Sequence, residues 1–201
     1  QDDVRPLVAD DVAHAHDHAV GRRAAHCKVP RRDFAKPQRV VQRQRVRDAR
    51  LIYASSPATY GDGEGGFADN DDLGALSALR PLNAYGYSKY LFDQYAAKQA
   101  DEGHAPSQWA GLKFFNVYGP NEYHKGGMKS VVAQIWPKVA ADEPVTLFRS
   151  HNPSYADGGQ MRDFVFVDDV IDIVDWLLES PGASGVFNAG SGQARSFLDL
   201  A

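Results

Sequence analysis

The stretch that decides the fold is NAYGYSKYLFDQYAAKQADEGHAPSQWAGLKFFNVYG, residues 83–119. Residues 83–102 predict a helix that Asn83 caps and Gly103 ends, because Asn favours helix N-caps and Gly favours helix stops. The apolar run LKFFNVYG at 112–119 predicts the strand that follows. A helix that leads into a buried strand is the repeating step of α/β folds.

Strands and helices alternate on both sides of this stretch. Upstream, LIYASS at 51–56 predicts a buried strand, and residues 57–83, which are rich in Gly, Asp and Pro, predict a long loop. We therefore expect an α/β fold with a mostly parallel sheet. Downstream, strands are predicted at 145–148, 163–167 and 185–190; helices are predicted at 128–141, which Pro137 should kink or interrupt, at 170–180, capped by Asp168 or Asp169, and at 196–201.

The predicted strands end in polar residues. In open parallel sheets, binding sites lie just beyond the carboxyl ends of the strands. We therefore expect one edge of the sheet to carry Ser55, Ser56, Asn116, Tyr118 and Asn188.

Composition argues against several classes of protein. The 201 residues are 43% hydrophobic, as in globular domains, and no apolar run approaches the roughly eighteen residues of a membrane span. The net charge of −4 argues against nucleic acid as a partner. Cys27 is the one cysteine, which rules out an internal disulfide and is compatible with a reducing, cytoplasmic location.

Residues 1–50 differ from the rest of the chain. They hold 12 Lys and Arg against 7 Asp, with one Leu, one Phe and no Ile, Tyr or Trp. So few large apolar groups do not offset the entropy lost on ordering a chain. The segment could be a basic disordered arm, a nucleic-acid patch or a stretch without an evolved role. Our hypothesis is an out-of-frame reading of a GC-rich gene, joined to the correct frame just before Leu51.

Tyr85 and Lys89 are four residues apart on the predicted helix, so their side chains share one face. A lysine ammonium beside a phenol favours the phenolate, which can remove a proton from an alcohol while hydride leaves the same carbon. The alternative is an ordinary amphipathic helix with a core tyrosine and a solvated lysine. Ser56, at the end of a predicted strand, could donate to the same substrate oxygen; the alternative is a serine satisfied by turn backbone.

Four motifs in order carry a resemblance to a known family: ASSPATYG at 54–61, YGYSK at 85–89, FFNVYGP at 114–120 and RDFVFVDDV at 162–170. Residues 51–201 resemble the extended short-chain dehydrogenase/reductase, or NAD-dependent epimerase/dehydratase, family. The resemblance implies a Rossmann-like catalytic part at 51–125 and a substrate-binding part at 126–201, interleaved with the last strands. It also implies NADP or NAD as cofactor and a nucleotide sugar as substrate.

Within the family, FNVYGPNEYHKGGMKSVV at 115–132 is most similar to the ADP-L-glycero-D-manno-heptose 6-epimerases. They invert C6″ of an ADP-heptose through a transient ketone, which needs acid/base groups on both faces of the sugar. The resemblance assigns these roles to Tyr85 and Lys125, polarisation of the sugar oxygen to Ser56, and tuning of the tyrosine to Lys89. For Lys125 the alternative is an ordinary surface lysine.

The same resemblance implies the remaining contacts, and no metal. Tyr85, Lys89, Val117 and Lys125 would contact the cofactor. Arg162 suits a diphosphate because its guanidinium binds two oxygens at once, although an ion pair with Asp163 is the alternative. The sequence departs from the family pattern at Pro57, Gly127 and Gln134. The residues expected to line the sugar-nucleotide pocket are Ser56, Asn116, Gly127, Gln134, Phe148, Arg149, Ser150, His151 and Arg162.

Other activities of the family compete with this one. Dehydratases usually carry an acid two positions beyond the serine, where this chain has Ala58 and Thr59. That difference favours an epimerase. The alternatives are a UDP-hexose 4-epimerase, which would need only Tyr85 and Ser56, and an inactive fragment that binds no cofactor. The resemblance also allows a homo-oligomer.

The glycine-rich turn that binds the dinucleotide pyrophosphate in this family opens a helix after the first strand. GDGEGG at 61–66 follows the Ser56 strand and predicts loop flexibility instead. The turn should lie upstream of Leu51, where residues 1–50 have the wrong character. We therefore expect this chain to lack the N-terminal half of its Rossmann-like domain.

The frame hypothesis makes a prediction about the gene. Translation of the other two frames upstream of the codon for Leu51 should yield a glycine-rich turn followed by an amphipathic helix. Gene sequencing provides the measurement, and finding neither feature in either frame would refute the hypothesis.

Overall fold

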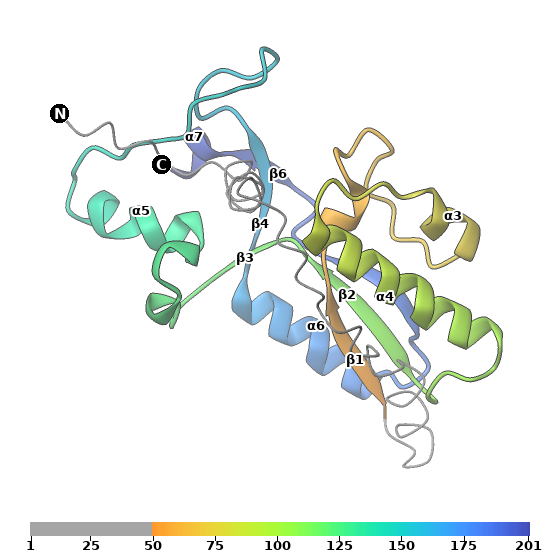
Figure 1. The fold of residues 1–201 in the computed structure, drawn as a ribbon. Coiled ribbons are helices and arrows are strands. Elements are labelled where there is room, and N and C mark those ends of the chain that lie inside the picture. The colour runs from red at the N-terminus through yellow and green to blue at the C-terminus, as the bar shows by residue number, and fades with distance from the viewer. Residues whose placement is uncertain (1–49) are drawn as a thin grey trace, which may run out of the picture. The chain divides into compact units, whose positions relative to one another are not determined.

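The computed structural model describes residues 50–201, so the predictions for residues 1–49 lie outside the described residues. The described chain forms two compact units (Figure 1). Residues 50–117 and Val165–Gly190 form one, here called the parallel-sheet unit. Tyr118–Phe164 and Ser191–Ala201 form the other, here called the α5 unit.

Three parallel strands form the centre of the parallel-sheet unit, in the order β1-β2-β5. Ser55 pairs with Lys113, and Lys113 pairs with Asn188, so the carboxyl ends of the strands meet at one edge. This arrangement confirms the predicted α/β fold and the placement of Ser55 and Asn188. The strands are β1 (Leu51–Ser55), β2 (Trp109–Phe114) and β5 (Gly185–Ala189).

Helices α4 (Ala84–Asp101) and α6 (Val167–Glu179) pack on opposite faces of this sheet. Trp109 packs with alanines of α4, whereas its neighbour Ala110 packs with Leu177 of α6. Successive side chains of a strand point to opposite faces, so a strand covered on both faces needs an unbroken apolar run. This requirement explains why β2 reads as a continuous buried strand.

The predicted ends of α4 are confirmed. The Asn83 side chain accepts a hydrogen bond from the Gly86 amide at 2.8 Å, which satisfies one of the amides left free at a helix start. At the other end Gly103 has a φ of +68°, the left-handed conformation that glycine adopts without strain.

The prediction of a single loop over residues 57–83 was wrong. It contains a 3₁₀ turn, η1 (Pro57–Tyr60), and a helix, α3 (Leu73–Ala78). The Asp72 carboxylate caps α3 by accepting from the Gly74 and Ala75 amides at 2.8 and 3.0 Å. A helix of six residues is too short to show a readable apolar period, so tertiary packing of Leu76 decides it.

The predicted strand at 112–119 is two strands. β2 ends at Phe114, and β3 (Asn116–Tyr118) belongs to a second sheet of order β3-β4-β6. Between them the Phe115 amide donates to Ala189, and its carbonyl accepts from Val117. The chain therefore leaves the parallel sheet at Phe115. Asn116 lies just beyond the carboxyl end of β2, whereas Tyr118 lies at the far end of β3.

The α5 unit contains η2 (Tyr123–Met128), α5 (Val131–Ala140), β4 (Met161–Phe166, whose last two residues belong to the parallel-sheet unit), β6 (Ala194–Ser196) and α7 (Phe197–Leu200). β4 and β6 pair antiparallel. The Phe197 ring lies 5.1 Å from the Phe148 ring and 5.8 Å from the Phe164 ring, centroid to centroid. This aromatic cluster holds α7 against β4.

Three further predictions of local structure were wrong. α5 continues through Pro137, because a proline there removes only one internal bond. Residues 145–148 form no strand in the described chain; the Phe148 carbonyl instead accepts from the Gly158 amide in a loop. Asp168 and Asp169 lie in the first turn of α6, where they favour its positive end, and Phe166 holds the cap position.

None of the helices in residues 50–201 is long and apolar enough to cross a membrane.

Candidate active site

Ser56 follows the carboxyl end of β1 and is 8% exposed. Its extended backbone makes it the cap of η1, and its Oγ accepts a hydrogen bond from the Ala58 amide at 3.2 Å. This contact is the hydrogen bond to turn backbone that the sequence offered as the alternative role of Ser56. The hydroxyl hydrogen is not used by that bond, so Ser56 retains a donor for a second oxygen.

Tyr85 and Lys89 lie one turn apart on α4, as the spacing predicts. The Lys89 Nζ donates to the Ala54 carbonyl oxygen at 2.9 Å and lies 5.7 Å from the centroid of the Tyr85 ring. The Lys89 ammonium therefore contacts both the carboxyl end of β1 and the face of the Tyr85 ring. The Tyr85 side chain itself is 57% exposed, so a ligand can reach its hydroxyl.

Asp93 continues the same helix face one turn beyond Lys89 and is 1% exposed. Its carboxylate accepts from the Ser55 hydroxyl at 2.7 Å and from the Tyr53 hydroxyl at 3.0 Å. Burial raises the pKa of Asp93, against the opposing effect of these two bonds and of the nearby lysine charges. Burial, followed by the Asp93 charge, also raises the pKa of Tyr53.

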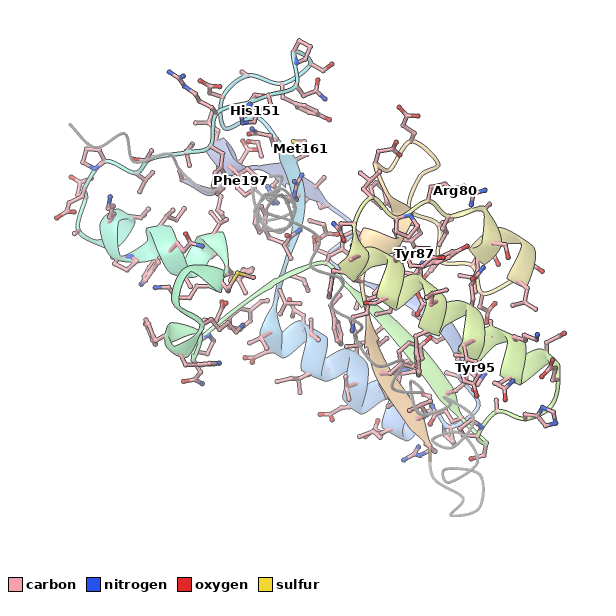
Figure 2. The ribbon with its side chains drawn as sticks, viewed as in Figure 1. Arg80, Tyr87, Tyr95, His151, Met161 and Phe197 are labelled. Atoms are coloured by element: carbon pink, nitrogen blue, oxygen red, sulfur yellow. The ribbon has the colours of Figure 1, made fainter. Side chains whose placement is uncertain are left out.

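Gly86 allows the start of α4 to approach the turn after Ser56. A Cβ on Gly86 would lie 2.6 Å from the Ala58 carbonyl oxygen, closer than real Cβ contacts. The helix therefore approaches η1 closely at Gly86 and contacts β1 at Asp93. Tyr87 and Tyr95 project from the same helix (Figure 2).

Sequence reasoning missed a buried lysine at this edge. Lys113 lies on β2 between Ser55 and Asn188 and is 0% exposed. Its Nζ lies 3.8 Å from the centroid of the Tyr60 ring and donates no hydrogen bond within residues 50–201. Burial lowers the pKa of Lys113, whereas the Asp93 and Asp69 charges act the other way. The sequence did contain one indication of this burial: Lys113 lies inside an apolar strand, and lysines are almost never fully buried unless they are paired.

Tyr60 links Lys113 to β5. The Tyr60 hydroxyl donates to the Asn188 Oδ1 at 2.7 Å, and burial raises its pKa to about 12. The Asn188 amide group in turn donates to the Phe67 carbonyl. A connected set of polar groups therefore lies below the carboxyl edge of the parallel sheet.

The α5 unit carries Lys125 on η2. Its Nζ lies 3.3 Å from the Glu122 carboxylate, and its side chain is 45% exposed. Gly127 and Gln134 come together, because the Gln134 Nε2 donates to the Gly127 carbonyl at 3.4 Å and to the Lys129 carbonyl at 2.7 Å. Two predicted pocket residues thus share one hydrogen bond.

Two of the remaining predicted pocket residues of the α5 unit lie at its aromatic cluster. The Arg162 guanidinium carbon lies 5.9 Å from the centroid of the Phe197 ring, which also packs on Phe148. The Ser150 amide donates to Asp157, and the Arg149 carbonyl accepts from Gln160. His151 is exposed in the loop that precedes β4 (Figure 2).

The structure divides the predicted site between the two units. Ser56, Tyr85 and Lys89 lie in the parallel-sheet unit, as do Asn116 and Val117 at the start of β3. The α5 unit holds Lys125, Gly127, Gln134, Phe148, Arg149, Ser150, His151 and Arg162.

Comparison with models of known protein families identifies the family of this chain. The model of the NAD dependent epimerase/dehydratase family matches residues 10–190. The chain belongs to this family. The match confirms the resemblance that the four motifs carry.

Several relatives within the family are known. ADP-L-glycero-D-manno-heptose-6-epimerases of Nitratidesulfovibrio vulgaris and Fusobacterium nucleatum are 54% and 50% identical to this chain, over 76% and 77% of it. The crystal structure of the Helicobacter pylori protein of the same name has a TM-score of 0.62 at 32% identity and covers 80% of this chain. The Thermus thermophilus UDP-glucose 4-epimerase in complex with NAD has a TM-score of 0.59 at 29% identity, also over 80%.

The chain spans about half the length of these relatives. The match covers 45% and 46% of the two heptose-epimerase sequences, and 46% and 49% of the two solved chains. The family assignment therefore rests on the shared part.

Tyr85 and Lys89 place a phenol and an ammonium near the carboxyl edge of the parallel sheet. GDGEGG does not open a helix: α3, which follows, begins only after Asp72. The Asp72 carboxylate accepts from the first amides of α3 and caps this short helix.

Asp93 should be important for stability because it balances the buried Lys113. Asp93→Asn keeps the shape but removes the negative charge, and we expect the free energy of unfolding to fall by roughly 2–4 kcal/mol. Denaturant unfolding followed by circular dichroism measures this change. Asp101→Asn, at the exposed end of the same helix, is the matched control and should change stability by less than about 0.5 kcal/mol. Equal effects of the two substitutions would contradict the assignment.

Proposed function

We propose that this chain derives from an NADP- or NAD-dependent nucleotide-sugar epimerase of the ADP-L-glycero-D-manno-heptose 6-epimerase type. The observation that carries the proposal is the placement of Lys89 between the Ala54 carbonyl and the Tyr85 ring, beside Ser56 at the end of β1. The identity of 50–54% to heptose epimerases supports the substrate class.

Tyr85 is the acid/base group on one face of the sugar. As a phenolate, its exposed oxygen accepts the proton of the sugar alcohol, and the Lys89 ammonium lies beside the same ring. Ser56 donates its free hydrogen to the same sugar oxygen, which orients the alcohol and polarises the ketone that forms. A nicotinamide bound beside Tyr85 and Lys89 would supply the acceptor for the hydride of the carbinol carbon and the donor that returns it.

Epimerisation requires a second acid/base group. The returning hydride must reach the other face of the ketone, so the oxygen then points away from Tyr85 and needs a different proton donor. Lys125 supplies that group in the proposal. Its ammonium carries a proton, and its half-exposed position on η2 leaves it accessible to a ligand.

The substrate is proposed to be a nucleotide diphosphate sugar, with ADP-heptose as the leading candidate. Arg162 offers a bidentate donor for a diphosphate, and Phe148 to His151 form the adjoining loop. NADP over NAD, a cytoplasmic location and assembly into a homo-oligomer belong to the same proposal, as does the absence of a nucleic-acid or membrane partner.

Two alternatives have specific support. The structural similarity to a UDP-glucose 4-epimerase favours a hexose epimerase that uses Tyr85 and Ser56 without Lys125. The lack of a glycine-rich turn that opens a helix in the described residues favours a fragment that does not retain cofactor.

Lys125 distinguishes the heptose enzyme from the hexose enzyme. At an NADP concentration that gives measurable turnover by the unsubstituted chain, Lys125→Ala should lower the rate of ADP-heptose epimerisation by on the order of 100-fold, because one proton transfer loses its donor. Interconversion of the two C6″ epimers is followed by NMR. Lys138→Ala, which removes an exposed lysine of α5, is the control and should leave the rate unchanged. An unchanged rate in Lys125→Ala would favour the hexose enzyme.

The affinity of this chain for NADP and NAD tests the alternative that it is a fragment that does not retain cofactor. Without a glycine-rich turn the pyrophosphate has no helix start to bind, so we expect weak or no binding of NADP and NAD by this chain. Fluorescence titration with NADPH and NADH measures the dissociation constants. A dissociation constant in the micromolar range would contradict this expectation.

A further inference from the structure

The Glu122 carboxylate accepts four hydrogen bonds within the α5 unit. It is 6% exposed, although it lies in a loop. Its Oε1 accepts from the Ser130 hydroxyl at 2.7 Å and from the Gly119 amide at 3.3 Å. Its Oε2 accepts from the Ser130 amide at 2.8 Å and from the Lys125 Nζ at 3.3 Å. One buried carboxylate therefore binds both ends and the middle of residues 119–130.

These bonds fix the segment that carries Lys125. Gly119 ends the turn after β3, and Ser130 is the N-cap of α5, where its hydroxyl accepts from the Ala133 amide. Between them, Gly126 takes a positive φ of +56° directly after the lysine. The Lys125 backbone amide also donates to the Glu122 carbonyl at 3.0 Å. The backbone amide and the side-chain ammonium of Lys125 thus both donate to Glu122.

The charge of Glu122 is maintained by the same contacts. Burial alone would favour the neutral acid, but the bonds from Ser130, Lys125 and Gly119 outweigh it and lower the pKa of Glu122 from 4.5 to about 2. The group is therefore ionised at any working pH, and its bond to the lysine is charge-assisted.

We propose that Glu122 is a positioning residue that holds Lys125 in the place from which it delivers its proton. The inference rests on the proposed function, in which Lys125 is the second acid/base group. Glu122 itself touches no substrate. It sets the position of the lysine through the closed loop of residues 119–130 and through the direct contact with Nζ.

The test measures the reactivity of each lysine, which needs neither cofactor nor turnover. Lysines of the full chain are acetylated with a limiting reagent, and the rate at each site is read by mass spectrometry. In Glu122→Gln the Lys125 amine loses its charge-assisted partner, so its acetylation should be roughly tenfold faster. Acetylation of Lys138 should be unchanged. An unchanged rate at Lys125 would overturn the proposal.

Glu102→Gln is the matched control. Glu102 also has a lysine partner, because its carboxylate lies 3.9 Å from the Lys98 Nζ, but the two side chains are 42% and 63% exposed. Exposed pairs restrain their lysine little. This substitution should change the Lys98 rate by less than about twofold and leave the Lys125 rate unchanged. A changed acetylation rate at Lys125 in Glu102→Gln would show that this rate does not depend specifically on the contact between Lys125 and Glu122.

A second measurement on the unsubstituted chain covers the case in which Glu122→Gln does not fold. The amides of Gly119 and Ser130 donate to Glu122, so both should be protected against hydrogen exchange although they lie outside any helix or strand. Exchange at the free-peptide rate at both sites would overturn the proposal.

Acid stability provides a further check. The folded pKa of Glu122 lies below its ordinary value of 4.5, so its contribution to stability is complete above that pH and is lost as the pH falls toward about 2. The difference in thermal midpoint between the unsubstituted chain and Glu122→Gln should therefore shrink over this range. A difference in thermal midpoint that stays constant over this pH range would contradict a stabilising role of the ionised Glu122 carboxylate. If the Glu122 contacts hold and Lys125→Ala leaves epimerisation unchanged, the proposed function fails and the geometry stands.

Discussion

The bond between Asp93 and the end of β1 is the constraint on which the parallel-sheet unit depends. A buried carboxylate that accepts from Ser55 and Tyr53 admits one position of α4 along the strand. Lys89 lies one turn earlier on the helix, so this position brings its ammonium to the Ala54 carbonyl. Tyr85 lies one turn earlier still. The helix that carries Tyr85 and Lys89 is therefore placed by the buried carboxylate of Asp93.

Small residues make this close approach feasible. Gly86 lets α4 approach the Ala58 carbonyl, and Gly111 lies under the Tyr53 side chain, where a Cβ would overlap the hydroxyl. Tyr53 and Gly111 are register partners on neighbouring strands. The Tyr53 hydroxyl can reach Asp93 because Gly111 leaves the space free. Glycine at these two places serves the polar contacts, since larger residues would push the helix from the sheet.

Both units use a buried carboxylate to control lysines. In the parallel-sheet unit Asp93 lies near Lys89 and Lys113, and in the α5 unit Glu122 binds Lys125. The two acids differ in electrostatics. Burial outweighs the bonds to Asp93 and raises its pKa, whereas the four donors to Glu122 outweigh burial and lower its pKa. The number of bonds that each carboxylate accepts is the main physical difference between the two sites.

The sequence by itself determined the α/β class, strands β1 and β5, the caps of α4 and the shared face of Tyr85 and Lys89, because these depend on local periodicity and on residue type. It did not reveal α3, which is too short to show a period, or the break at Phe115, which arises from a bond to a distant strand. It also did not distinguish Lys113 and Glu122 from ordinary surface charges. Only the tertiary structure decided that Lys113 and Glu122 are buried and what each contacts. Burial of a charge depends on elements far apart in the chain, and local sequence carries no record of them.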